Sequence, residues 1–160
     1  MRVFIYLLSL LLGLLSSAVA NQSLYERFKS PPASTVPALL KIDWSKPENK
    51  MAQKYKAAFE MKLAQVKSGE GHLLGQRFVV INPGCGSECQ VIGYFDTLTG
   101  NAYLTQLSSS YGLEYHANSS LLIINPADKI TETYGADVPD WLKTRYYHIN
   151  DNAELNEVTP

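Results

Sequence analysis

Residues 78–100 read FVVINPGCGSECQVIGYFDTLTG, and this stretch decides the fold. Two apolar runs, 78–81 and 90–95, flank a short loop that holds both cysteines of the chain, and a polar turn ends at Gly100. Apolar runs of this length between turn residues are typical of buried strands. The second run, the turn and residues 101–105 predict a β-hairpin, because a glycine-containing turn joins two strand-like segments.

Short strand-like segments continue to the end of the chain, where serine, asparagine and proline separate them. They lie at residues 113–116, 121–124, 145–149 and 154–158, and residues 139–143 predict one helical turn capped by Asp137. Their spacing of roughly ten residues is typical of an antiparallel arrangement. We therefore expect an α+β fold with an antiparallel β-meander of five or six strands.

One amphipathic helix precedes these strands and is expected to pack on the sheet. The sequence Ser45-Lys46-Pro47-Glu48 combines a capping box with a proline in the first turn, which is a strong signal for a helix start. Helix-spaced positions then form one largely apolar stripe, ending before Ser68-Gly69. The stripe comprises Met51, Tyr55, Ala58, Phe59, Lys62, Leu63 and Val66.

The amino-terminal residues 1–20 match a secretory signal peptide. Arg2 supplies the positive charge, Val3–Leu15 the apolar region, and Ala18-Val19-Ala20 the small-residue pattern for cleavage. The alternative, an uncleaved membrane anchor, needs a longer apolar run. We expect cleavage after Ala20 and a periplasmic or secreted protein without a membrane span after cleavage.

The rest of the chain divides into an extended lead-in and one domain. Residues 21–46 contain three prolines among small polar residues, so little regular structure is expected there, and residues 47–160 form a single α+β domain. The formal net charge is −1 and the basic residues are scattered, which argues against nucleic acid as a partner.

The two cysteines lie in the loop 84–89. Three residues separate them, which is the wrong spacing for a C-x-x-C redox pair, and no second cysteine or histidine pair stands nearby to complete a metal site. In an oxidising compartment the expected state of Cys85 and Cys89 is a disulfide. A stapled loop loses less entropy on binding, so the same loop is also a candidate contact surface.

Four residues of this loop are candidate binding residues. Gly84 and Gly86 permit positive φ angles, which would let backbone N–H groups converge into an anion-binding concavity, and Ser87 and Glu88 project at the tip. The alternative is that the glycines only permit the turn. No catalytic, metal-binding or cofactor-binding residue is predicted.

Two other functions remain open on the sequence. One is a cell-envelope hydrolase in which His72, Glu88 and Asp96 converge beside the loop. The other is a structural or peptidoglycan-associated role of the second half of the chain, which is rich in tyrosine. Five of its tyrosines are Tyr111, Tyr115, Tyr134, Tyr146 and Tyr147, for which core packing is the alternative explanation.

The chain resembles a group of uncharacterised exported bacterial proteins over roughly fifty residues. The shared pattern is a strand, a G-C-G-x-x-C loop, a second strand and a D-x-x-T-G turn, matched here by residues 78–100. A later strand of the S-x-L-L-I kind is matched by Ser119 to Ile124. The resemblance implies export and a disulfide, and it implies no known activity.

The order of the elements is also similar in layout to the periplasmic inhibitors of vertebrate lysozyme. In those proteins a cystine-closed loop enters the active-site cleft of the enzyme. The loop here is one residue shorter and has no histidine, so Ser87 and Glu88 would be the presented groups. Together the observations favour a non-enzymatic binding or inhibitor module, whose partner is another exported protein or an envelope component.

Overall fold

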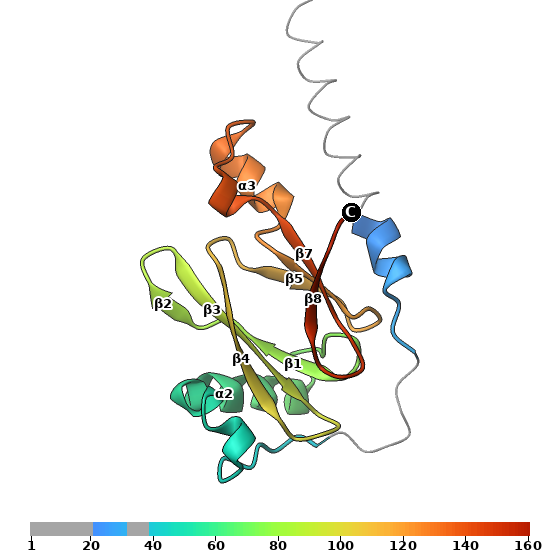
Figure 1. Ribbon diagram of the computed structural model, residues 1–160, viewed down its shortest axis with the longest axis vertical. Coiled ribbons are helices and arrows are strands. Elements are labelled where there is room, and N and C mark those ends of the chain that lie inside the picture. Colours follow the sequence, from blue (N-terminus) through green and yellow to red (C-terminus); the bar gives the residue numbers. More distant parts are fainter. Residues whose placement is uncertain (1–20, 32–38) are drawn as a thin grey trace, which may run out of the picture.

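The structure, a computed structural model, describes residues 21–31 and 39–160 and has the predicted α+β class, with two antiparallel four-stranded sheets (Figure 1). The first sheet contains β1 (Phe78–Ile81), β2 (Gly84–Gly86), β3 (Cys89–Asp96) and β4 (Ala102–Ser109). The second contains β5 (Leu113–Tyr115), β6 (Leu121–Ile124), β7 (Arg145–Ile149) and β8 (Leu155–Val158). The labelled helices are α2 (Lys56–Ser68) and α3 (Ala127–Tyr134), with 3-10 helices at Pro47–Asn49, Ala52–Tyr55 and Asp140–Leu142.

Strand β3 is the centre of the first sheet. β1 and β2 pair with successive parts of β3, and β4 pairs with it along nearly its whole length. The β3–β4 pair is the hairpin predicted from the sequence, with Phe95 opposite Ala102. The buried side chain of Asn49 fixes the start of β4, because it accepts the Ala102 N–H at 2.7 Å and donates to the Gly100 carbonyl at 3.1 Å.

The second sheet has the order β5-β6-β7-β8 and is itself a meander. Within the described residues, eight strands in two sheets thus replace the expected single meander of five or six strands. The chain leaves the first sheet at residues 110–112, where the Asn125 side chain accepts the N–H groups of Ser110 and Tyr111 and Gly112 has φ +81°. This turn redirects the chain, and its geometry is not encoded in the alternation of apolar residues.

Apolar clusters on both faces of β1 and β6 show how the sheets are layered. Even-numbered residues of both strands belong to one cluster shared by the two sheets, and odd-numbered residues of β1 belong to a second cluster with α2. The shared cluster includes Phe78, Val80, Leu122 and Ile124, and the second includes Phe59, Leu63, Val79 and Ile81. Because both faces of these strands are buried, their sequences are continuous apolar runs.

The helical region begins differently from the expected capping box. Ser45 donates its hydroxyl to the Asp43 carboxylate, and Lys46 occupies the cap position without a side-chain hydrogen bond. Two 3-10 turns come first, α2 begins only at Lys56, and the helix ends before Gly69 at φ +80°, as the sequence indicates. Met51, which the apolar stripe included, is 75% exposed.

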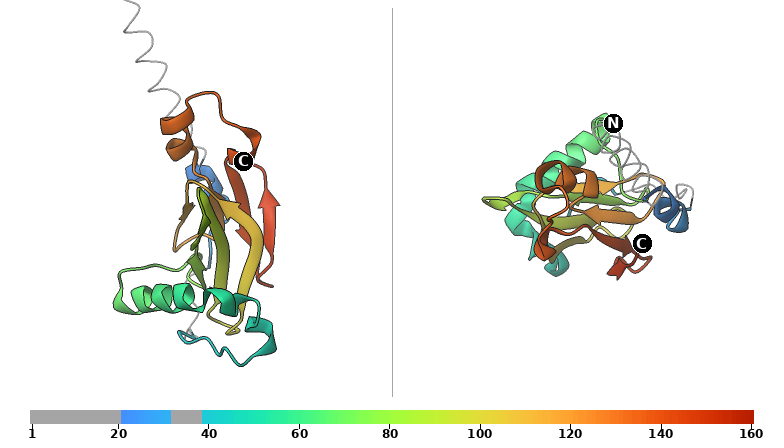
Figure 2. Two further views of the ribbon diagram at one scale, coloured as in Figure 1. Left: turned by 90° about the vertical axis from the view of Figure 1, so that its left-hand side faces the viewer. Right: turned by 90° about the horizontal axis from the view of Figure 1, so that it is seen from above.

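Residues 21–27 are helical, although the lead-in 21–46 was expected to be extended. Leu24 is 3% exposed and clusters with Leu121 and Ile123 of β6, so this helix covers the second sheet. The three prolines that suggested an irregular segment follow the helix and do not interrupt it. The carboxyl terminus lies beside the same helix (Figure 2), where the Arg27 guanidinium donates to the Thr159 carbonyl at 3.2 Å.

The predicted signal peptide, residues 1–20, lies outside the described residues, as do residues 32–38. Within the two described ranges, the structure contains no helix that is both long and apolar enough to cross a bilayer.

Candidate functional site

The cystine loop lies at the tip of a hairpin that projects from the side of the molecule (Figure 1). Cys85 and Cys89 form a disulfide with their Cα atoms 5.2 Å apart, and β2 pairs with the start of β3 on either side of the bond. Residues 84–88 are all exposed. The loop therefore faces solvent.

The backbone of the loop differs from the expected concavity. Gly86 has a positive φ of +146°, but Gly84 does not, and the other residue with positive φ is Glu88 at +54°. The two glycines therefore do not act together as a pair of left-handed residues. The carbonyl of Glu88 accepts the Ser110 hydroxyl at 2.6 Å, which attaches the loop to the turn after β4.

Two half-buried tyrosines, Tyr111 and Tyr134, lie near this loop. The sequence did not distinguish them from the other tyrosines. The rings of Tyr111 and Tyr134 meet edge to face with their centroids 6.2 Å apart. The pKa of Tyr134 is raised mainly by its hydrogen bond and electrostatic interaction with Tyr111, then by burial, and least by the charge of Glu88. Tyr115, Tyr146 and Tyr147 belong instead to the apolar clusters, which is the packing role that the sequence also allowed.

Each of the three histidines contacts a carbonyl group or an aromatic ring nearby. His72 Nε2 lies 3.3 Å from the Tyr115 carbonyl, His116 contacts the edge of Tyr25 with centroids 4.1 Å apart, and His148 stacks on Phe28 at 4.9 Å.

The hydrolase arrangement of His72, Glu88 and Asp96 does not form. Glu88 and Asp96 lie at opposite ends of β3, roughly 25 Å apart for a strand of this length. Asp96 is fully buried, and its carboxylate is bound by Arg77 through two hydrogen bonds of 2.8 Å. This version of an active site is therefore wrong, because the three groups share no surface.

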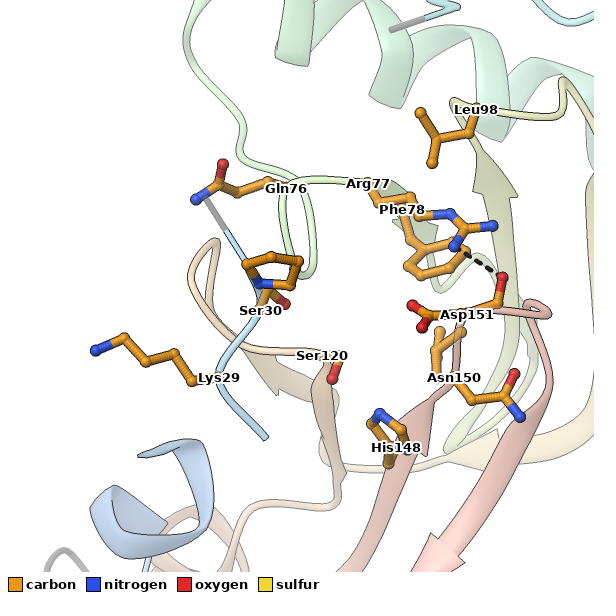
Figure 3. A pocket seen from close by; sticks show the side chains of 13 residues that line it. Lys29, Ser30, Gln76, Arg77, Phe78, Leu98, Ser120, His148, Asn150 and Asp151 are labelled. Atoms are coloured by element: carbon orange, nitrogen blue, oxygen red, sulfur yellow. Dashed lines mark hydrogen bonds between the residues drawn. The ribbon is translucent and has the colours of Figure 1, made fainter. Parts of the chain in front are cut away.

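A polar pocket of about 330 Å³ lies at the Asp96 end of the strands (Figure 3), and no residue of the cystine loop lines it. The amino-terminal segment, the turn before β1, the end of β7 and the turn after it contribute its walls. The lining residues include Ser30, Arg77, Phe78, Ser120, His148 and Asp151. Arg77 spans the site, because its guanidinium also donates to the Asp151 carbonyl at 2.9 Å.

Turn chemistry explains how the sequence builds this pocket. Gly75 and Gln76 have positive φ angles of +59° and +60°. A Cβ atom at Gly75 would lie 2.7 Å from the Ser30 hydroxyl oxygen. A glycine is therefore required for the amino-terminal segment to approach β1 so closely. The glycine was visible in the sequence, but its partner 45 residues earlier was not.

Among the described residues that line the pocket, no nucleophile is hydrogen-bonded to a base. The Ser120 hydroxyl donates to the Phe28 carbonyl at 3.2 Å, and the described residues give it no bond to His148. Burial lowers the pKa of His148, and the nearby charge of Asp151 opposes this effect only in part.

No group of three or more histidine, cysteine, aspartate or glutamate side chains within residues 21–31 and 39–160 is arranged to hold a metal ion. Comparisons of the chain with known protein-family models, with curated proteins and with solved structures found no match.

Proposed function

We propose that the protein is an exported, non-enzymatic binding or inhibitor module that contacts its partner through the loop 84–89. The observation that carries this proposal is the disulfide-closed hairpin tip, which is exposed from Gly84 to Glu88. The partner is another exported protein or a component of the cell envelope.

The physical argument rests on the low conformational freedom of the loop. The disulfide restricts five residues, and the hydrogen bond from Ser110 to the Glu88 carbonyl attaches the tip to the first sheet. Ordering a side chain or loop on association costs about 0.5–1.5 kcal/mol for each group immobilised, so a loop ordered beforehand binds more tightly for the same contacts.

The surroundings of the loop supply contact area. Tyr111 and Tyr134 lie beside Glu88, and tyrosine is enriched at the energetic centres of protein interfaces because it is large, rigid and amphipathic. Glu88 adds one negative charge at the tip. A partner with an aromatic or cationic recess would complement these three side chains.

The test incubates three immobilised proteins, the parent, a loop variant and a control, with an extract of envelope proteins from the source cell. Quantitative mass spectrometry then measures which proteins each of them retains. The loop variant carries Ser87→Lys and Glu88→Lys, and the matched control carries Glu157→Lys, an exposed acid on β8. We expect partners retained by the parent and by the control to be lost from the loop variant. A loop variant that keeps every partner of the parent contradicts the proposal.

Export is tested separately from binding. The full chain, expressed in a bacterial host, is expected in the periplasm or medium with Asn21 as its first residue, which intact-mass measurement of the recovered protein determines. Recovery of the intact leader in the membrane fraction would instead indicate an anchored protein.

A further inference from the structure

The side chains around the polar pocket differ in the direction they face. The Asp151 carboxylate, the His148 ring and the Ser120 hydroxyl turn toward the pocket, whereas Lys29 and Gln76 point away from it (Figure 3). The groups that face a ligand are therefore one carboxylate, one imidazole and one hydroxyl, with apolar wall from Phe78.

The turn that carries Asp151 is fixed before any ligand binds. Arg77 donates to the Asp151 carbonyl at 2.9 Å, and Arg77 is itself held by the buried carboxylate of Asp96. On the other side, the Asn150 side chain accepts the N–H groups of Asn152 and Glu154 at 3.0 and 2.9 Å. A site whose supporting groups are already bonded loses little freedom when a ligand enters.

The opposite wall of the pocket is fixed as well. His148 stacks on Phe28 with centroids 4.9 Å apart, and Ser120 donates both its N–H and its hydroxyl to the Phe28 carbonyl. Gly75 lets the amino-terminal segment approach the turn before β1 closely through Ser30. The pocket thus exists as a preformed recess between two strands and the amino-terminal segment.

The charged groups that line this recess differ in whether they have a direct partner, and the exposed Asp151 carboxylate acts on Arg77 and His148 only through its nearby charge. The positive charge of Arg77 is matched by Asp96 at 2.8 Å, and Lys29 pairs with Glu26 at 3.5 Å outside the pocket. Within the described residues the Asp151 carboxylate forms no ion pair and accepts no hydrogen bond. A ligand that places a positive charge beside this carboxylate is therefore favoured over an anion.

We infer that the pocket binds a small organic ammonium ion, a primary amine on a compact carbon skeleton. The ammonium group donates to the Asp151 carboxylate, with the Ser120 oxygen and the ring of His148 as the next polar groups, and the skeleton lies against Phe78. The volume of about 330 Å³ accommodates a molecule of the size of an amino sugar or a short diamine. This site is separate from the cystine loop and does not depend on the proposed contact of that loop.

The experiment follows backbone amide shifts of the purified mature protein by NMR during titration with two amines, glucosamine and 1,5-diaminopentane. Their neutral counterparts, N-acetylglucosamine and 1,5-pentanediol, serve as matched ligands. We expect saturable shifts at residues 75–77 and 148–151 with an amine and weaker binding of its neutral counterpart. The amine that binds with the higher affinity shows whether the ligand is sugar-like or aliphatic.

Two variants locate the charge that matters. Asp151→Asn removes the carboxylate from the pocket and breaks no hydrogen bond of the described residues, so we expect an intact fold and about tenfold weaker amine binding, the typical loss of a charged hydrogen bond. Glu157→Gln changes an exposed acid elsewhere and should bind as the parent does. Equal binding of amines and neutral analogues, equal affinity of the Asp151→Asn variant, or no saturable shift at millimolar amine would each overturn the inference.

Discussion

Replacement of Asp96 by asparagine tests the role of the buried ion pair at the end of β3. The carboxylate is fully buried and accepts four hydrogen bonds, two from Arg77 at 2.8 Å, one from the Leu98 N–H at 3.0 Å and one from the Thr99 hydroxyl at 2.8 Å. The Asp96→Asn variant keeps the shape but leaves Arg77 without its counter-charge. Removing one partner of a buried pair costs about 3–5 kcal/mol. Because the Arg77 side chain is 18% exposed and can still be hydrated, we expect the lower end, about 3 kcal/mol.

The same substitution should change the pH dependence of stability. Burial disfavours the ionised form of Asp96, but the hydrogen bonds from Arg77, Leu98 and Thr99 outweigh it and hold the pKa below its ordinary value. A carboxyl group whose pKa is lower in the folded state stabilises the fold above its unfolded pKa of about 3.9, and that contribution is lost as the pH falls through the folded pKa. The stability difference between the parent and Asp96→Asn is therefore expected to shrink below about pH 4.

The measurement is urea unfolding followed by circular dichroism at pH 7 and at a series of lower pH values. Asp140→Asn is the matched control, because Asp140 is an exposed aspartate whose partner is the exposed Lys143, and its midpoint should stay close to that of the parent. An Asp96→Asn variant as stable as this control at pH 7 would refute the reasoning. A stability difference that does not change with pH would refute the part that concerns ionisation.

Three further outcomes are expected. Leu24→Ala should lower the free energy of unfolding by about 2–3 kcal/mol and accelerate hydrogen exchange of residues 21–27, and unchanged exchange would show that this helix is not docked on the second sheet. Gly75→Ala should lower the free energy of unfolding in a urea titration by about 1–3 kcal/mol. Gly69→Ala should lower it less, because Gly69 also has a positive φ but has open space around it. Equal losses would exclude a steric role for Ser30. Burial should give His148 an NMR titration midpoint below that of histidines in the urea-unfolded chain. The free energy of unfolding should then fall as the pH drops from about 6.5 through the folded pKa of His148. A midpoint at or above the unfolded value contradicts this expectation.

The sequence predicted the strands best where apolar runs end at turn residues. The four residues of β1 and of β6 are completely buried and followed by Asn-Pro, which makes both elements visible without a structure. The disulfide was predicted from the expected oxidising compartment, and its two cysteines belong to one short loop. Such features depend on residues that are close in sequence.

Elements that depend on distant partners were missed. Helix α3 was not predicted because it buries only one side chain, Ile130, and follows a proline that reads as a turn. The helix at residues 21–27 owes its position to contacts with β6, about a hundred residues away. The Arg77–Asp96 pair and the polar pocket likewise join segments whose proximity is created by the tertiary fold, so local patterns carry no signal for them.

The docking of residues 21–31 also fixes an order of events during synthesis. Tyr25 donates to Glu114 at 2.9 Å, and Arg27 reaches the carbonyl of Thr159, the residue before the last. A chain that emerges amino terminus first exposes Leu24 long before β6 exists to cover it. A nascent chain therefore carries the apolar face of Leu24 uncovered until residues 121–124 have also been made, about a hundred residues later.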